Sequence, residues 1–422
     1  MKLRLTHIIE VVLLTIVFFL VNIRSFIFWN LYPETGSLTR EAWREIFIWL
    51  MALFMMFYLL EKRNLLRRYL LAWQKEPVLV IFVLFSLASV LWSSMWTVTL
   101  HRSLVFTFAT MTAVFLGLRY SLNGFLQVLY WFGAVIVAVS FLLVFISPAL
   151  GTDLSPVYGG AWRGVFWHKN QLGNILPILN LVFLIRFFSL KNNDASIEKT
   201  LAIALYIFSL VEIVFAKSAS GYILFILLHF IFGSAFLWLK IRHLLRPLHY
   251  YVIFAITLVG AAGILLNLEF VLGLFNRTTA FTGRVPMWMI LLRDVFPQNR
   301  WFGQGFGTVW ADLAFRLHMR DVAGWPYPIM IGDNGFLDVL LNLGIVGLLL
   351  FLFNYIKVWV ISARYSLQEL SLEGFFPIIF MIYTLFANIT YSLFLETEVF
   401  VWLLIVTLMV ILTQKRNEIY ND

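Results

Sequence analysis

Apolar stretches of roughly 20 residues recur along the whole chain, separated by short clusters of charged residues, glycine and proline. A helix that crosses a bilayer needs a stretch of about that length. Hydrophobic residues make up 62% of the 422 residues and charged residues only 13%, too few to cover a water-soluble globule of this size. The sequence therefore predicts an all-α, polytopic membrane protein.

This pattern predicts about twelve spanning helices in a single membrane domain over residues 1–422. The first stretch is too long for a signal-peptide core and has no small-residue cleavage site, so we expect it to be retained. The expected spans are Ile8–Trp29, Trp43–Leu60, Val78–Trp96, Ser103–Leu118, Phe125–Ile146, Leu172–Leu190, Leu201–Ala216, Tyr222–Leu239, Tyr251–Leu268, Phe336–Ile356, Phe375–Tyr391 and Val399–Leu412.

Basic residues gather in every second connection, which predicts that this side faces the cytoplasm, because positively charged loops stay inside. An even number of spans then places both termini in the cytoplasm. The same distribution accounts for the net charge of +9, so we expect no nucleic-acid partner. The basic residues of this side are Lys62, Arg63, Arg67, Arg68, Lys75, Arg119, Lys191, Lys199, Lys240, Arg242, Arg246, Lys357, Arg364, Lys415 and Arg416.

The longest polar segment, Asn267–Asn334, falls on the outer side, between the ninth and tenth spans. An outer face without a function should be poor in Lys and Arg, yet several lie there. They either bind an anionic ligand or pair with acids and lipid head groups. The outer loops are Asn30–Ala42, Thr97–Arg102, Ser147–Gln171, Lys217–Gly221, Asn267–Asn334 and Ser392–Glu398, and three of them hold Arg163, Lys169, Lys217, Arg277, Arg284, Arg293, Arg300, Arg316 and Arg320.

Residues 162–174 lead from an outer loop into the sixth span and place two cations and an imidazole among aromatic residues. The planar guanidinium of Arg163 and the ammonium of Lys169 both suit the oxygens of a pyrophosphate. His168 directly precedes Lys169. The alternative is interfacial anchoring, in which Trp and Arg mark the head-group level of the membrane.

The outer turn at 216–221 contains Lys217, and Glu212 lies just before it, inside the seventh span. A carboxylate inside a membrane is costly and usually has a partner or a task. The sequence is equally compatible with a structural ion pair to Lys217 and with a catalytic role.

Residues 282–286 open a predicted amphipathic helix near 284–296, with Pro286 in a first-turn position. A helix start offers amide donors to anions, so Arg284 is expected to stand beside a phosphate site. Gly303, Gly305 and Gly307 follow without a preceding strand, so a compact backbone near a substrate, or simply a tight loop, explains them better than a dinucleotide site.

Asp333 and Asn334 lie at the outer mouth of the tenth span. Asp333 can act as a general base on a sugar hydroxyl that Asn334 orients. Helix capping is the alternative, because Asp and Asn are preferred N-cap residues. The chain contains no Cys, and no outer set of Asp and Glu has the pattern of a divalent metal site, so we expect no metal.

Six segments, in this order, resemble the O-antigen ligase and polysaccharide polymerase superfamily, and most of all its exopolysaccharide-polymerase branch. They are RGVFWHKNQLGN, AKSASGY, TGRVPMW, WFGQGFGTVW, DNGFLDVLLNLGIVG and ANITYSLFLETE, and they extend from about Arg163 to the final helices. The resemblance implies a metal-independent, cofactor-free, inverting glycosyltransferase of the bacterial cytoplasmic membrane. Its substrate would be an undecaprenyl-diphosphate-linked oligosaccharide, polymerised at the outer side among the membrane lipids. A flippase and a chain-length regulator of the same pathway would be its partners.

Carried over by position, the resemblance assigns diphosphate binding to Arg163 and Arg284, with Lys169 in support. Lys217, in the second matching segment, is a further candidate for that role.

The sequence departs from the family at the expected base. Where many relatives have His-Asn-Gly, this chain has Asp333, Asn334 and Gly335. Asp333 is therefore expected to act as the base, and His168 and His318 are the alternatives.

Two other functions fit the same sequence. A ligase would use the same donor but transfer the glycan to another acceptor. A flippase for lipid-linked oligosaccharides should carry charged residues through a central cavity. The polar residues gather on one face instead, which favours an enzyme. The few charges inside the expected spans lie mostly near helix ends and are Glu10, Arg24, Arg186 and Glu212.

Overall fold

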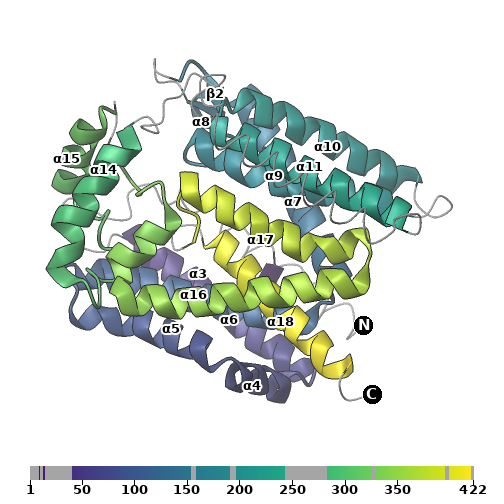
Figure 1. Ribbon diagram of the computed structural model, residues 1–422, viewed down its shortest axis with the longest axis horizontal. Coiled ribbons are helices and arrows are strands. Elements are labelled where there is room, and N and C mark those ends of the chain that lie inside the picture. The colour runs from purple at the N-terminus through teal and green to yellow at the C-terminus, as the bar shows by residue number, and fades with distance from the viewer. Residues whose placement is uncertain are drawn as a thin grey trace.

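The computed structural model describes residues 40–153, 158–190, 196–242, 283–325, 328–394 and 399–419, together with Ile9, Leu13 and Leu14. Nearly all regular structure in this part of the chain is helical (Figure 1). The strands β1 (Thr152–Asp153) and β2 (Ala161–Trp162) form one short antiparallel pair. The predicted all-α class is confirmed.

Long helices form the body of the molecule: α3 (Arg40–Lys62), α5 (Pro77–Ala88), α6 (Trp96–Arg119), α7 (Leu122–Ile146), α9 (Lys169–Ser189), α10 (Ser196–Phe215), α11 (Ala219–Ile241), α16 (Gly335–Glu369), α17 (Leu372–Thr390) and α18 (Phe400–Ile419). Shorter elements connect them: α4 (Leu66–Lys75), η1 (Ser89–Leu91) and α8 (Pro148–Gly151). Among the described residues, seven helices are long and apolar enough to cross a membrane, or eight if the bent pair α4–α5 is one span. The chain is therefore a multi-pass membrane protein.

Most of the expected spans coincide with these helices to within a few residues, as Phe125–Ile146 does with α7 and Phe375–Tyr391 with α17. A single apolar stretch suffices to place such a helix, because a spanning helix satisfies all its backbone hydrogen bonds internally. The expected span Tyr251–Leu268 and nearly all of Ile8–Trp29 lie outside the described residues.

The expected outer loop Thr97–Arg102 is helical instead and forms the first turns of α6. The Nε2 atom of His101 lies 3.2 Å from Oε2 of Glu45 on α3, and both side chains are fully buried. The Arg102 guanidinium donates a 2.6 Å hydrogen bond to the carbonyl of Gly307. The prediction of a loop was wrong because the polar side chains of this segment find partners within the protein and need no water.

The expected span Phe336–Ile356 is part of a longer helix that is interrupted. Gly344 has φ 67° and ψ −168°, so α16 consists of a short first part and a long second part. A Cβ atom at this position would lie 2.3 Å from the Trp301 carbonyl group, so the backbones meet directly. Four hydrogen bonds join the break to the chain at 300–305: Gln304 N to Leu341 O and Gly305 N to Asn342 O, both 3.0 Å, Ile345 N to Arg300 O, 2.9 Å, and Val346 N to Trp301 O, 3.1 Å.

The segment before α16 folds into a small unit of its own. It contains α14 (Arg284–Ile290), η4 (Leu291–Val295), η5 (Phe296–Asn299) and α15 (Leu313–Ala323). The predicted helix near 284–296 is confirmed, and α15 was not expected. The first residues of the expected outer segment, 267–282, lie outside the described part. Apolar side chains from α14, η4, α15, the first part of α16 and the connections on either side of α15 form a second core: Met287, Leu291, Val295, Val309, Trp310, Met319, Ile329, Leu337 and Leu341.

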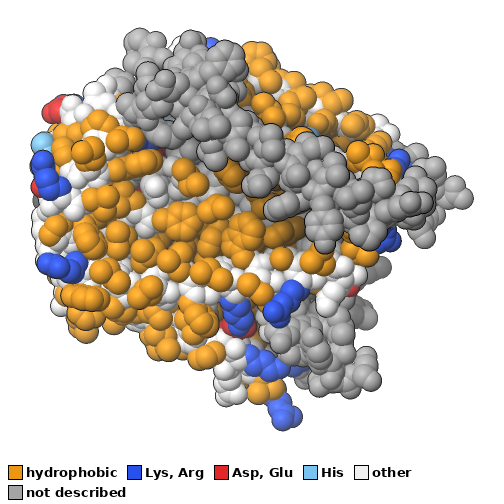
Figure 2. Space-filling model, in the orientation of Figure 1, with side chains coloured by type: hydrophobic (Ala, Val, Ile, Leu, Met, Phe, Trp, Pro, Cys, Tyr) orange, Lys and Arg blue, Asp and Glu red, His pale blue; other side chains and the backbone are white. Residues whose placement is uncertain are grey.

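The helices run back and forth between two ends of the bundle. We call the end where α9, α11 and α16 begin the site end, and the opposite end, with Lys62, Arg119 and Lys240, the basic end. Figure 2 shows hydrophobic side chains over much of the described surface in this view. Large side chains such as Phe54 and Phe230 are 76% and 67% exposed, which suits contact with lipid rather than water.

Candidate functional site

An ion pair joins α14 to the turn before α16. The Nε atom of Arg284 lies 2.7 Å from Oδ2 of Asp333, and the two side chains are 17% and 5% exposed. Arg284 is the first residue of α14, and Gly283 before it has φ 89°. A Cβ atom at Gly283 would lie 2.1 Å from the Ala323 carbonyl oxygen, so only glycine fits between α14 and α15. The sequence expectation that Arg284 starts a helix is confirmed.

Asp333 combines strain with burial. Its φ of 50° lies in the left-handed region, which costs a residue with a side chain about 1 kcal/mol or more. Burial raises the pKa of its carboxyl group, and the neighbouring Arg284 guanidinium opposes that rise only in part. A strained carboxylate with a raised pKa, beside a guanidinium, is the kind of group that acts as a general base.

Asp338 holds this region together, and sequence reasoning did not single it out. Its buried carboxylate accepts a 2.8 Å hydrogen bond from Trp310 Nε1, a 3.1 Å bond from Gly332 N, and a bond from the Ser392 hydroxyl. A second indole fixes the same turn, because Trp288 Nε1 donates to the Gly332 carbonyl at 2.6 Å. The available signal was a carboxylate in the first turn of an apolar span.

Asn334 is the N-cap of α16. Its Oδ1 atom accepts hydrogen bonds from the backbone amides of Phe336 and Leu337, both 3.1 Å. The backbone amide of Asn334 donates to Ser392 Oγ at 3.1 Å. The capping interpretation is therefore correct. A role in orienting a hydroxyl stays a prediction.

The other expected site residues form a separate group at the start of α9. The Arg163 guanidinium donates to three carbonyl oxygens, those of Leu150 at 3.0 Å, Ala149 at 3.1 Å and Trp167 at 3.2 Å. Burial lowers its pKa, and Asp153 opposes that change. These bonds fasten α8 to the turn before α9, so Arg163 has a structural role whatever else it binds.

His168 is the N-cap of α9. Its Nδ1 atom accepts a 3.2 Å hydrogen bond from the Asn170 amide, and the Gln171 side chain accepts one of 3.2 Å from the His168 amide. Burial, with the neighbouring Lys169 charge adding to it, lowers the pKa of His168 to about 4. The ring is neutral at pH 7, and its Nδ1 atom already accepts the capping hydrogen bond. The role of His168 as an alternative base stays a prediction.

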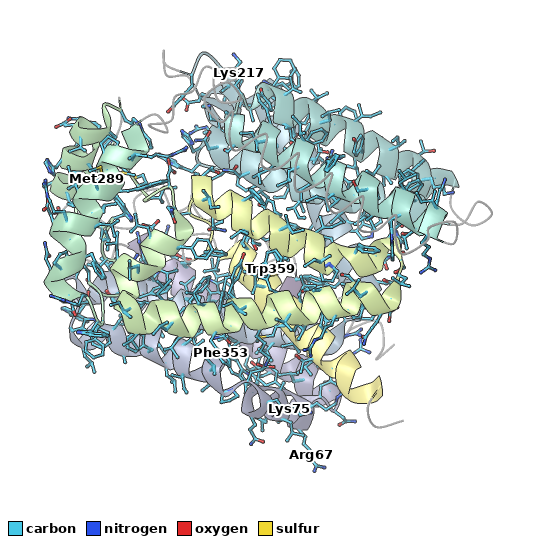
Figure 3. The ribbon with its side chains drawn as sticks, in the orientation of Figure 1. Arg67, Lys75, Lys217, Met289, Phe353 and Trp359 are labelled. Atoms are coloured by element: carbon cyan, nitrogen blue, oxygen red, sulfur yellow. The ribbon has the colours of Figure 1, made fainter. Side chains whose placement is uncertain are left out.

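The side chain of Lys169 contacts the backbone of Lys217. The buried Lys169 Nζ donates a 2.7 Å hydrogen bond to the Lys217 carbonyl and lies 4.8 Å from the centre of the Tyr158 ring. The exposed Lys217, at the edge of the site end in Figure 3, donates from Nζ to the Gly159 carbonyl at 3.0 Å. The considered ion pair with Glu212 is not formed, since that carboxylate is fully buried and has no hydrogen-bond partner among the described residues.

His318 lies on the exposed side of α15. It interacts electrostatically with Asp294, which forms an exposed 2.7 Å ion pair with Arg293. The contact between Gly283 and Ala323 places α15 beside the start of α14. The role of His318 as an alternative base stays a prediction.

The structure thus divides the predicted residues into two groups at the site end. One contains Arg284, Asp333 and Asn334, and the other contains Arg163, His168, Lys169 and Lys217. Helix α17 and the residues after it contact elements of both groups. The Tyr383 hydroxyl donates to the Asn174 carbonyl on α9 at 2.8 Å, and the chain beyond α17 reaches Asp338 through Ser392.

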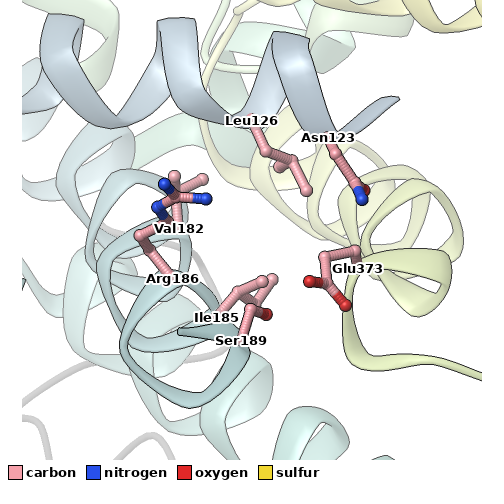
Figure 4. Close-up of a pocket in the computed structure, with 7 residues that line it drawn as sticks. All are labelled: Asn123, Leu126, Val182, Ile185, Arg186, Ser189 and Glu373. Carbon is pink, nitrogen blue, oxygen red and sulfur yellow. The ribbon is translucent and has the colours of Figure 1, made fainter. Parts of the chain in front are cut away.

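A polar pocket of about 190 Å³ lies at the basic end (Figure 4). One of its walls, Arg186, is 17 residues beyond Lys169 along α9, roughly 25 Å away. The pocket is therefore separate from both groups. Its lining residues are Asn123, Leu126, Val182, Ile185, Arg186, Ser189 and Glu373.

Among the described residues no three His, Asp or Glu side chains gather in a way that could hold a metal ion. No protein-family model matches the chain, and no curated protein matches it.

Proposed function

We propose that this protein polymerises undecaprenyl-diphosphate-linked oligosaccharide units into surface polysaccharide, by inverting glycosyl transfer without a metal or cofactor. The observation that carries the proposal is the partly buried Arg284–Asp333 pair, which sets an anion-binding group 2.7 Å from a candidate base. The resemblance of the six sequence segments to polysaccharide polymerases supplies the substrate class.

The chemistry needs few protein groups. A hydroxyl oxygen of the acceptor bonds to the anomeric carbon of the donor, the bond from that carbon to the diphosphate breaks, and the electron pair leaves with the diphosphate. The hydroxyl proton passes to Asp333. Arg284 contacts Asp333 through Nε, and the two terminal nitrogens of a guanidinium suit phosphate oxygens, so its charge can stabilise the leaving group.

The second group contributes to the same site in this proposal. Lys217 is exposed and can add a positive charge near the diphosphate, whereas Lys169 is buried against a carbonyl. Arg163 can bind the diphosphate only by giving up carbonyl partners, so we assign it mainly to holding the loop before α9. Asn334 orients the acceptor hydroxyl.

The proposed topology has about twelve spans, with both termini in the cytoplasm and the site end facing outward from the bacterial cytoplasmic membrane. The cations of the basic end support this orientation. The partners would be membrane lipids and the flippase and chain-length regulator of the same pathway.

The experiment deletes the gene and complements it with Asp333→Asn, Arg284→Ala and Arg293→Ala. We expect the first two variants to leave single repeat units on the lipid carrier and no long chains. Arg293→Ala is the matched control, because this arginine lies in the same helical segment but is exposed and forms an ion pair with its chain neighbour Asp294. An Asp333→Asn variant that makes full-length polymer at normal expression would overturn the proposal.

The same strains separate the alternatives. Full-length polymer that stays on its carrier after deletion would indicate a ligase. Repeat units that stay on the cytoplasmic side would indicate a flippase. Glu45 and His101 form a buried contact between two ionisable side chains that a transporter could use, but they lie near the starts of α3 and α6 and not midway along them.

A further inference from the structure

Helix α4 runs across the direction of the helix that follows it. The bend between α4 and the pair α5–η1 is 86°, with Glu76 and Pro77 at the corner. The α5–η1 segment is apolar and packs along α16 and α6 in the bundle. If α5 crosses the membrane, α4 must lie nearly parallel to the membrane plane, at the basic end.

One side of α4 is fixed to the bundle. Tyr69 is buried, and its hydroxyl donates a 3.1 Å hydrogen bond to the carbonyl of Met111 on α6. Its ring meets Phe57 and Trp73 edge-on. Arg68 donates to the Gln414 side chain on α18 at 3.1 Å. These contacts hold the helix in a fixed rotation about its axis.

The rest of α4 exposes apolar and basic side chains together. Leu66, Leu70 and Leu71 are 41%, 55% and 41% exposed, and Arg67 and Lys75 are exposed as well. Figure 3 shows Arg67 and Lys75 extending from the edge of the bundle, and Figure 2 shows Lys and Arg gathered over this region. We call these five residues the α4 surface.

The segment around this surface is positively charged overall. Residues 61–76 contain five basic and two acidic side chains, so the segment has a net charge of +3. One of the acids, Glu76, already forms an ion pair with Lys357 on α16. The counter-charge for Arg67 and Lys75 must therefore come largely from outside α4.

We propose that the α4 surface binds the head groups of anionic phospholipids, with its leucines in the interfacial layer and Arg67 and Lys75 on the phosphates. A helix that lies in the membrane plane and joins exposed leucines to cations has the composition of an interfacial lipid-binding helix. Charge complementarity favours an anionic lipid over a zwitterionic one. This proposal is independent of the glycosyltransferase assignment.

The test uses the purified full-length protein in a neutral detergent and counts bound lipids by native mass spectrometry. The probes are phosphatidylglycerol and phosphatidylcholine with identical acyl chains. Each cation near a membrane surface contributes roughly a five-fold change in affinity, so Arg67→Gln/Lys75→Gln should weaken phosphatidylglycerol binding by about 25-fold. Added salt should weaken the wild-type binding.

The matched control is Lys240→Gln/Arg242→Gln, which removes two exposed cations from the end of α11 at the same end of the bundle. We expect it to change the affinity by less than about two-fold, given the short range of the interaction. Circular dichroism and size-exclusion chromatography check that each variant is folded.

Three results would overturn the proposal: equal binding of the two lipids by the wild type, unchanged phosphatidylglycerol binding by Arg67→Gln/Lys75→Gln, or an equal loss in the control. A stoichiometric polypeptide that copurifies and is lost in the same double variant, without a change in lipid binding, would show that the α4 surface binds a protein instead.

Discussion

The hydroxyl group of Ser392 donates a hydrogen bond to Oδ2 of Asp338, although 54 residues separate the two in the chain. This bond connects the turn after α17 to the start of α16. The same carboxylate also accepts hydrogen bonds from Trp310 Nε1 and from the backbone amide of Gly332, the residue before Asp333. The position of the candidate base Asp333 therefore depends on Asp338, a buried residue that need not touch a substrate.

Asp338→Asn should lower the free energy of unfolding by about 2 kcal/mol, because the amide replaces one acceptor oxygen with a donor among three buried donors. Ser392→Ala removes only one of these donors and should cost about 1 kcal/mol. Denaturation of the detergent-solubilised protein measures both. We expect polymer synthesis to fall in the same order, and equal stability in all three proteins would contradict the arrangement.

Gly344→Ala should destabilise the protein far more than Gly324→Ala, although both glycines have φ 67°. At Gly324 nothing lies within 4 Å of an added Cβ, so the cost is the left-handed conformation alone, about 1 kcal/mol. At Gly344 ψ is −168°, a combination restricted to glycine, and the Cβ would meet the Trp301 carbonyl at 2.3 Å. Thermal unfolding of the two variants gives the comparison. Equal melting temperatures would mean that α16 is not broken there.

The pH dependence of stability and of activity should have opposite signs at Asp333. Because the pKa of Asp333 is raised in the folded protein, the native state binds the proton more tightly than the unfolded state. Its stabilising contribution is complete below the unfolded pKa of about 3.9 and is lost as the pH rises through the folded value. Activity should instead rise with pH over the same range, since a base must be deprotonated. Asp333→Asn should remove this part of the stability slope.

Arg284→Gln refines that test. Without the guanidinium, the opposing contribution to the pKa of Asp333 disappears, so its pKa should rise further. The acidic limb of the residual pH–rate profile should move to higher pH relative to the wild type. Arg293→Ala serves as the control and should leave the limb in place. A limb that stays unmoved in Arg284→Gln would show that another group controls it.

Arg163→Ala should cost about 2 kcal/mol or more, because it leaves the carbonyl groups of Leu150, Ala149 and Trp167 without their donor. Arg163→Lys should restore little of this, since a single ammonium cannot match the fork geometry of a guanidinium. Lys217→Ala, at an exposed position, should change stability by less than about 0.5 kcal/mol. Chemical denaturation distinguishes the three variants. An Arg163→Ala protein as stable as the wild type would show that Arg163 has no structural role.

Much of the site could be placed in the right region from the sequence, but not in the right contacts. Arg284 at a helix start and Asn334 as a helix cap follow from local rules about the first turn of a helix. The partners of Lys169 and Arg163 cannot be predicted from such rules, because both side chains donate hydrogen bonds to backbone carbonyls, which no side-chain pattern reveals. Asp338 was overlooked because two of its three hydrogen-bond donors, Trp310 and Ser392, lie 28 and 54 residues away in the chain.

The sequence by itself determined that the chain forms apolar helices long enough to span a membrane, and it located most of them, because that property depends only on about 20 neighbouring residues. Tertiary structure alone decided that Thr97–Arg102 continues a helix, that α16 breaks at Gly344, and that Asp333 meets Arg284. Each of these depends on a partner distant in the chain, which supplies a hydrogen bond or occupies a space that local preference cannot specify.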